Sequence, residues 1–245
     1  MGSNSVRRFS LVLGGLVLCA CAGLATRAHA EAPPIINETW TTSHPANWVF
    51  SGAAAVGNVN GTNAMILTPN SNSQRGSALY NAAFGSSSGL SIQFDYYAGP
   101  ATAGADGISF FLCDGNQGTP SLGGQGGCLA YMDNVYGSSD PKSNGLSKGY
   151  IGIGFDEYGN WSSSQYNGSG PGAQSNEVAI RGAGNGNSGY SYLTGTSVRN
   201  NGGIGGGWRR VNIVITPSKY VTVKMSWNAG ATWWTFALSP HFFGV

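Results

Sequence analysis

Charged side chains are scarce in this sequence, since only 9% of its 245 residues are Asp, Glu, Lys or Arg. No amphipathic helical stretch of any length occurs, and Lys and Arg are not clustered as they are in nucleic-acid-binding proteins. Cysteine is also rare, with 4 residues in the whole chain. The sequence therefore predicts neither a helical protein nor a nucleic-acid partner.

Residues 1–30 have the layout of a secretory signal peptide. A basic start at Arg7 and Arg8 precedes an apolar run rich in Leu, Ala and Gly, and small residues flank a cleavage point after Ala30. The apolar run is short for a transmembrane helix of roughly 20 residues, although Cys21 leaves a lipoprotein start open. We expect a mature chain that is secreted, periplasmic or on the cell surface, without a transmembrane segment. Removal of the signal leaves a formal net charge of −1.

Residues 31–245 are predicted to form a single all-β domain, because one β-sandwich commonly reaches this size. Short runs of Val, Ile, Tyr, Phe and Trp recur between clusters of Gly, Asn and Ser, which is typical of strands and turns. Ser91–Tyr97 alternates apolar and polar residues, and Ile108–Cys113 is mostly apolar, as in a buried strand. Gly126–Tyr131 is predicted to be a returning strand.

Two cysteines, Cys113 and Cys128, remain after removal of the signal. An exported protein with two cysteines most simply pairs them. The predicted disulfide would contribute roughly 3 kcal/mol in the chain-entropy model. Two separate buried thiols are the alternative.

The stretch Gly149–Trp161 combines an apolar strand with oxygen-bearing side chains. Its glycine-spaced apolar half is followed by Asp156, Glu157, Tyr158 and Asn160. Closely spaced oxygen donors suit a hard cation such as calcium. A strand that ends in a solvated turn explains the same residues, since Asp, Gly and Asn are common turn residues. The stretch alone leaves both interpretations open.

Four sequence blocks follow one another in a characteristic order. They are ADGISFFL (Ala105–Leu112), GGCLAY (Gly126–Tyr131), IGFDEYGNW (Ile153–Trp161) and NEVAIRG (Asn176–Gly182). In this order they resemble the L-type, legume-lectin-like family, part of the concanavalin A-like lectin and glucanase superfamily. The bacterial exported branch is the closer match, through GLSKGYIGIGFDEYGN and RGAGNGNSGYSYLTGT. The resemblance implies a jelly-roll antiparallel β-sandwich whose loops hold calcium and a sugar at one end.

The resemblance also implies roles for individual residues. Asp106 is similar to an aspartate that accepts hydrogen bonds from sugar hydroxyls, and Gly127 to a glycine whose backbone N–H donates to the sugar. Asn160 resembles an asparagine that binds both metal and sugar, and Asp156 resembles the metal carboxylate. Tyr158 occupies a position that offers its carbonyl to calcium and its ring to the sugar.

The chemistry of these residues agrees with sugar binding. Sugar hydroxyls both donate and accept hydrogen bonds, so a carboxylate beside an amide suits them. The apolar C–H face of a sugar also suits an aromatic ring.

Three positions depart from the legume pattern. Gly154 stands where the family has a metal-binding glutamate, Ser164 where it has a second metal aspartate, and Glu177 near its metal-binding histidine. These departures argue against manganese. They leave a single calcium ion, with Glu157 or Glu177 as an additional ligand.

We therefore expect a non-enzymatic, carbohydrate-binding protein whose partner is a glycan or polysaccharide. A structural or adhesive surface domain with a degenerate sugar site is one alternative, and a glycoside hydrolase on the same fold is another. A hydrolase needs two carboxylates that flank the scissile bond, but Asp156 and Glu157 are expected on opposite faces of their strand. Asn160-Trp161-Ser162 also fits a glycosylation pattern, and a glycan there would destroy the site.

The sequence ends at Val245, where the family normally adds further strand. We expect a sandwich that lacks its C-terminal strand or strands, and an unpaired sheet edge that favours association.

Overall fold

The computed structural model describes residues 34–99, 104–115, 119–136, 141–167 and 169–239. The chain separates into a short N-terminal unit, Met1–Asn37, and a main unit, Glu38–Val245. The expected signal peptide lies outside the described residues, so its cleavage stays a prediction. None of the helices in the described residues combines the length and apolar character of a membrane span.

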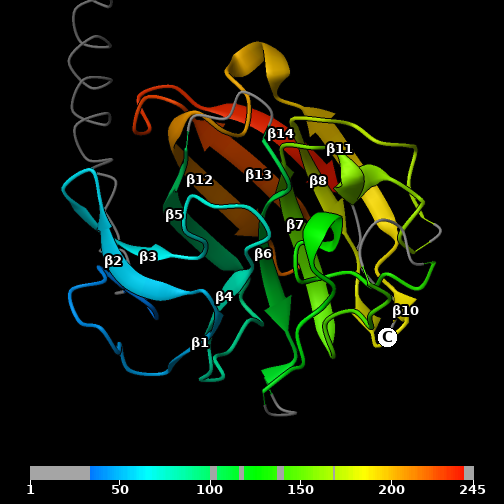
Figure 1. Cartoon of the computed structure of the whole chain (residues 1–245), viewed down its shortest axis with the longest axis horizontal. Coiled ribbons are helices and arrows are strands. Elements are labelled where there is room, and N and C mark those ends of the chain that lie inside the picture. The colour runs from blue at the N-terminus through cyan, green and yellow to red at the C-terminus, as the bar shows by residue number, and fades with distance from the viewer. Residues whose placement is uncertain (1–33, 100–103, 116–118, 137–140, 168, 240–245) are drawn as a thin grey trace, which may run out of the picture. The chain divides into compact units, whose positions relative to one another are not determined.

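The larger sheet of the main unit contains the stretch on which the sequence prediction centred (Figure 1). Its strands are β6 (Gly107–Cys113), β7 (Gly149–Asp156), β8 (Glu177–Arg181), β9 (Gly184–Asn185), β10 (Ser188–Gly189) and β11 (Tyr192–Ser197). β7 is antiparallel to both β6 and β8. Asp156 at its end is in register with Gly107 on β6 and with Glu177 on β8. Two segments distant in sequence are thereby placed beside the end of β7.

The smaller sheet has the order β14-β13-β12-β5, and all its neighbours are antiparallel. Its strands are β5 (Leu90–Ala98), β12 (Gly207–Ile215), β13 (Val221–Ser226) and β14 (Trp234–Ser239). Two further antiparallel pairs join β1 (Trp48–Gly52) to β4 (Gly76–Tyr80) and β2 (Ala55–Val59) to β3 (Thr62–Ile66).

Apolar side chains from the two main sheets form one core. Phe94 of β5 packs edge-on against Phe155 of β7, with ring centroids 6.1 Å apart. Ile153 of β7 and Val211 of β12 are fully buried in the same cluster. This face-to-face packing makes the main unit a β-sandwich.

A second apolar cluster covers the opposite face of the larger sheet. Ala179 belongs to it, whereas its β8 neighbours Val178 and Ile180 belong to the first core, as the alternation of a strand requires. Loop residues supply most of the cluster, including the fully buried rings of Tyr131 and Trp161. The larger sheet is therefore buried on both faces.

The predicted all-β class and antiparallel sandwich are confirmed, but the predicted strand at Gly126–Tyr131 is wrong. This segment forms a 3-10 helix, η2 (Gly126–Cys128), followed by Leu129 and Ala130 with φ values of 48° and 61°. Consecutive left-handed residues turn the chain and cannot continue a strand.

Candidate functional site

β7 directs two kinds of residue to its two faces. Its larger apolar side chains enter the core of the sandwich, and the alternate positions face the loop-covered side. The core-facing residues are Ile151, Ile153 and Phe155, and the loop-facing residues are Gly152, Gly154 and Asp156. The glycine spacing noted in the sequence thus creates a side-chain-free strip that leads to a carboxylate.

Aromatic rings of the loops lie on this strip. A Cβ atom at position 154 would lie 2.5 Å from Cδ2 of Trp161, and one at position 152 would lie 2.6 Å from Cε1 of Tyr131. Real Cβ atoms do not approach other atoms so closely, so only glycine fits at either position. The space that a side chain at position 154 would occupy is filled by the indole of Trp161.

Asp156 is fully buried and organises the turn that follows β7. Its Oδ1 accepts the N–H of Gly159 at 2.8 Å, and its Oδ2 accepts the N–H of Trp161 at 2.6 Å. Gly159 has a φ of 118°, a conformation that favours glycine. A short 3-10 helix, η3 (Asn160–Ser162), then begins. Asp156 therefore fixes the backbone on which Tyr158 and Asn160 are presented.

A second carboxylate, Glu177, faces Asp156 from β8, because the two are a cross-strand pair. Glu177 is 4% exposed. Its Oε1 accepts the Tyr192 hydroxyl at 3.1 Å, while its Oε2 has no hydrogen-bond partner within the described residues. The Ser162 hydroxyl lies near Glu177 but donates to the carbonyl of Gly159. The site therefore contains a buried carboxylate oxygen with unused acceptor capacity.

Burial raises the pKa of both carboxylates. The pKa of Asp156 rises to about 7, because desolvation outweighs the hydrogen bonds from Gly159 and Trp161, and the charges of Asp106 and Glu177 raise it further. The pKa of Glu177 is also raised by burial, against the lowering effect of Ser162, Tyr192 and Arg181. The end of β7 thus favours a proton or a cation.

We expect stability to fall as pH rises, because the pKa of Asp156 goes from 3.8 to about 7 on folding. Between these values the folded state binds more protons than the unfolded state, so the free energy of unfolding decreases with rising pH. Urea denaturation in EDTA should give a free energy of unfolding that is roughly 2 kcal/mol higher at pH 5 than at pH 7.5.

The Asp156→Asn variant should lose most of this slope, whereas Asp95→Asn, at an exposed carboxylate on the smaller sheet, should retain it. Equal slopes in the wild-type protein and Asp156→Asn would contradict the expectation.

Gly127 and Asn160, two predicted site residues from separate segments, are in contact. A Cβ atom at position 127 would lie 2.8 Å from Asn160 Nδ2. Asn160 is 7% exposed and is held by two bonds, since its Nδ2 donates to the Tyr166 hydroxyl at 2.8 Å and its Oδ1 accepts Gln165 Nε2 at 3.2 Å. The structure thus brings η2 against the turn after β7.

Asp106 and Tyr158 meet at the same turn. The carbonyl of Asp106 accepts the N–H of Glu157 at 2.9 Å and the N–H of Tyr158 at 3.2 Å. The side chain of Asp106 is half-buried, and that of Tyr158 is 59% exposed. Its exposed ring makes Tyr158 the predicted site residue most accessible to a ligand.

Glu157, which the sequence left open as a metal ligand, directs its carboxylate toward different residues from those around the Asp156 carboxylate. Its carboxylate contacts the other wall of the turn, where a Cβ atom at Gly205 would be 2.6 Å from Glu157 Oε1, and it also abuts Gly104. Burial raises the pKa of Glu157, and Arg209 lowers it. Of the two additional acids considered, Glu177 is the one placed next to Asp156.

The two cysteines are not joined by a disulfide in the structure. The thiol of Cys128 donates to the carbonyl of Asp133, with Sγ 3.4 Å from the oxygen. Cys113 packs against the same apolar cluster from β6. Cys128 lies on the 3-10 helix η2 and not on the predicted returning strand.

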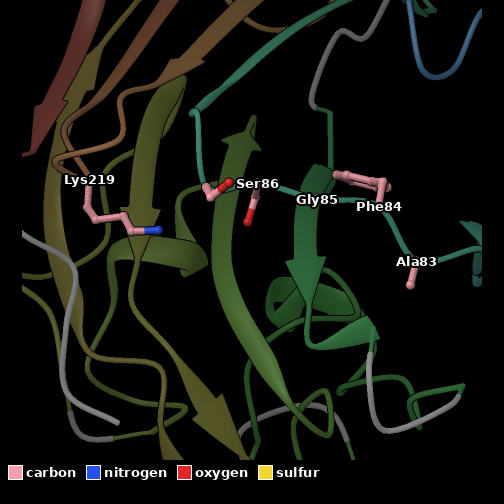
Figure 2. Close-up of a pocket in the computed structure, with 6 residues that line it drawn as sticks. Ala83, Phe84, Gly85, Ser86 and Lys219 are labelled. Carbon is pink, nitrogen blue, oxygen red and sulfur yellow. The ribbon is translucent and has the colours of Figure 1, made fainter.

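A surface hollow of about 610 Å³ lies away from these residues. It is bounded by residues 83–87 and Lys219, and Figure 2 shows the amino group of Lys219 directed toward the segment that contains Ser86. The amino group is also 5.9 Å from the centre of the Tyr150 ring, at the opposite end of β7 from Asp156. None of the predicted site residues lines this hollow.

The sequence interpretation missed two buried residues, Tyr166 and Arg181. Tyr166 binds Asn160, and Arg181 hydrogen-bonds to the loop after β7. A signal for Arg181 was present, because an arginine two residues after Ala179 shares its loop-covered face.

The exoplasmic/lumenal domain of VIP36, in a crystal structure of its Ca2+/Man-bound form, is similar to this chain in structure. The match has a TM-score of 0.49 and 15% sequence identity, and it covers 79% of this chain and 70% of that chain. No protein-family model matches the chain. A similarity at this level carries no assignment of function.

Proposed function

We propose that this protein is a non-enzymatic, lectin-like carbohydrate-binding protein whose site comprises Asp106, Gly127, Tyr158 and Asn160. One observation carries the proposal. Asp106 is hydrogen-bonded to the backbone at Tyr158, and Gly127 is in contact with Asn160, so two segments distant in sequence converge on the turn after β7. The resemblance of the four sequence blocks supports the same site.

The arrangement offers what a sugar requires. The Asp106 carboxylate can accept two hydroxyl protons, and the N–H of Gly127 is a backbone donor beside the Asn160 side chain. Tyr158 presents an exposed ring to the C–H face of a pyranose. Asn160 is largely buried, and its amide already hydrogen-bonds to Tyr166 and Gln165. The second N–H and the second lone pair of this amide would be available to the ligand.

A single calcium ion belongs to this proposal, because the donors at the end of β7 suit a hard cation. Asp156, the Tyr158 carbonyl and Asn160 would hold it, and Oε2 of Glu177, which has no hydrogen-bond partner within the described residues, is a candidate additional ligand from the neighbouring strand β8. When bound, calcium would neutralise the paired buried carboxylates and stiffen the turn. Within the described residues, no three His, Cys, Asp or Glu side chains are grouped for a metal, so the affinity should be modest.

A second, manganese-type position does not fit these residues. The family glutamate is replaced by Gly154, and the indole of Trp161 fills the space above that glycine. We therefore include no transition metal in the proposal.

Glycan binding should depend on calcium. On a glycan array in about 1 mM CaCl2, roughly the dissociation constant of the weakest protein calcium sites, the protein should bind at least one class of glycan. Replacing calcium with EDTA should weaken that binding about 10-fold, because the Asp156–Asn160 turn loses a charge that orders it. Manganese in place of calcium should not restore it.

Two other outcomes of this experiment would point to different conclusions. Binding to no glycan in either condition would favour a structural or adhesive surface domain with a degenerate site. The engagement of both Asp156 oxygens by backbone N–H groups favours that alternative. Equal binding with and without calcium would support carbohydrate binding but contradict a role for calcium in it.

A glycoside hydrolase is a weaker candidate. The acids that face one another are Asp156 and Glu177, and they are 0% and 4% exposed, so neither is accessible to a glycosidic bond. Sustained release of reducing ends from oligosaccharides by the protein would instead support the hydrolase function.

Export to a compartment that contains glycans completes the proposal. The support is the signal-peptide pattern of residues 1–30. Detection of a mature N-terminus at Glu31 outside the cytoplasm would test it.

A further inference from the structure

Arg181 at the end of β8 is fully buried and uses its whole guanidinium group within the protein. Nε donates to the carbonyl of Trp161 at 2.7 Å, and Nη1 donates to Asn167 Oδ1 at 3.0 Å and to the carbonyl of Tyr190 at 2.7 Å. Nη2 donates to the carbonyls of Ser163 at 3.2 Å and Ser169 at 2.8 Å. All five guanidinium N–H donors are therefore engaged.

Four of these five oxygens belong to the loop that follows the candidate site. We call residues Trp161–Asn167 together with Ser169 the Arg181-bound segment. Apart from Trp161 and Ser162, which belong to η3, this segment forms neither helix nor strand. Ordering such a chain costs about 1–2 kcal/mol per residue in backbone entropy. The four charge-assisted hydrogen bonds that Arg181 donates to this segment offset part of that cost.

Arg181 keeps its positive charge although all of its hydrogen-bond acceptors are uncharged. Burial lowers the pKa of Arg181 only to about 10, so the group stays protonated at neutral pH. Among the described residues, no carboxylate lies within ion-pair distance of Arg181, although Asp133 and Glu177 contribute favourable charge from farther away. The guanidinium carbon is also 5.9 Å from the centre of the Trp161 ring. Arg181 thus contacts the backbone and the side chain of the same residue.

We propose that Arg181 is an internal tie that orders the Arg181-bound segment, so that the order of this segment does not depend on a metal ion. The tie runs from the rigid β8 strand to the loop, and Trp161 is pinned between Arg181 and the bare face of Gly154. The buried guanidinium group of Arg181 thereby orders the loop without an external ligand.

The tie also reaches the candidate sugar site through Asn160. Both residues that hold the Asn160 amide, Gln165 and Tyr166, belong to the Arg181-bound segment. Loss of the tie should therefore let the amide rotate and weaken glycan binding. This consequence rests on the proposed function, whereas the order of the segment does not.

Hydrogen–deuterium exchange of the full chain tests the tie directly. In Arg181→Met, amide exchange in residues 161–167 should be at least about 100-fold faster than in wild type, because charged hydrogen bonds to the segment are lost and it opens locally. Exchange in the β12–β13 hairpin should change much less. Arg181→Lys keeps the charge but not the planar fork, and it should resemble Arg181→Met.

Arg210→Met is the matched control. Arg210 also donates to a backbone carbonyl, that of Ala229, and it pairs with Asp95, but it lies on the smaller sheet. Its removal should leave exchange in residues 161–167 within about twofold of wild type, since it touches none of them. Addition of EDTA to the wild-type protein should likewise leave exchange in residues 161–167 unchanged.

Two results would overturn the tie. One is wild-type exchange in residues 161–167 of Arg181→Met, and the other is an EDTA effect as large as that of the substitution. If Arg181→Met does not fold, Asn167→Ala removes one acceptor from a half-buried position, and it should speed exchange in the segment about 5-fold. Unchanged exchange in Asn167→Ala would then count against the tie.

Discussion

Asp106→Asn is expected to lower the affinity for the bound glycan by at least about 100-fold, because a carboxylate that accepts two hydroxyl protons is replaced by one acceptor and one donor. The fold should survive, since Asp106 supports the turn through its backbone carbonyl, which accepts from Glu157 and Tyr158. Isothermal titration with the best glycan from the array measures the affinity, and a thermal melt measures the fold.

Asp95→Asn is the control for charge. Asp95 is a partly exposed carboxylate on the smaller sheet, paired with Arg210, and it lies on a different sheet from the proposed site. Its replacement should leave glycan affinity within about twofold, since the sites share no partners. If Asp106→Asn binds as tightly as the wild-type protein, the sugar site lies elsewhere on the molecule.

Gly154→Glu, which introduces the acid found in the legume pattern, is expected to prevent folding. A side chain at position 154 collides with the Trp161 indole, because a Cβ atom alone would lie 2.5 Å from its ring. The new carboxylate would also be buried next to Asp156 and Glu177, which costs several kcal/mol. Gly154→Ala makes only the collision and should cost about 3 kcal/mol. Urea denaturation of the soluble variants measures both effects.

Gly182→Ala provides the matched control for the glycine substitution. Gly182 directly follows β8, and a Cβ atom there would meet Leu193 Cδ1 at 3.6 Å, an ordinary contact. The cost should stay below about 1 kcal/mol. Equal stability of Gly154→Ala and Gly182→Ala would show that Trp161 does not occupy the strip above Gly154.

The strands and the turn after β7 were predictable because their signals are local. The alternation in Ser91–Tyr97 places one face of β5 in the core, and the predicted apolar run is strand β6. Asp156, Tyr158 and Asn160 are neighbours in sequence, so a turn at Gly159 suffices to gather them. Short-range periodicity and turn chemistry encode such features directly.

The partners of these residues were not predictable to the same degree. Glu177 and Glu157 were both candidates in the sequence, and the structure separates them, because strand register pairs Glu177 with Asp156 whereas the Glu157 carboxylate lies against Gly205. The predicted Cys113–Cys128 bridge is absent from the structure, where a helical turn replaces the expected strand at Cys128. Register and loop conformation depend on contacts between distant segments, which a single sequence does not display.

The local residue pattern is enough to predict that Gly149–Asp156 is a strand with one apolar face and one face of glycines that ends in a carboxylate, because side-chain alternation is a property of one strand. What covers those glycines is seen only in the folded protein, where the ring of Trp161 lies on Gly154 and Arg181 binds the loop that contains Trp161. The filling of a bare strip requires close packing among residues that the chain brings together only when it folds.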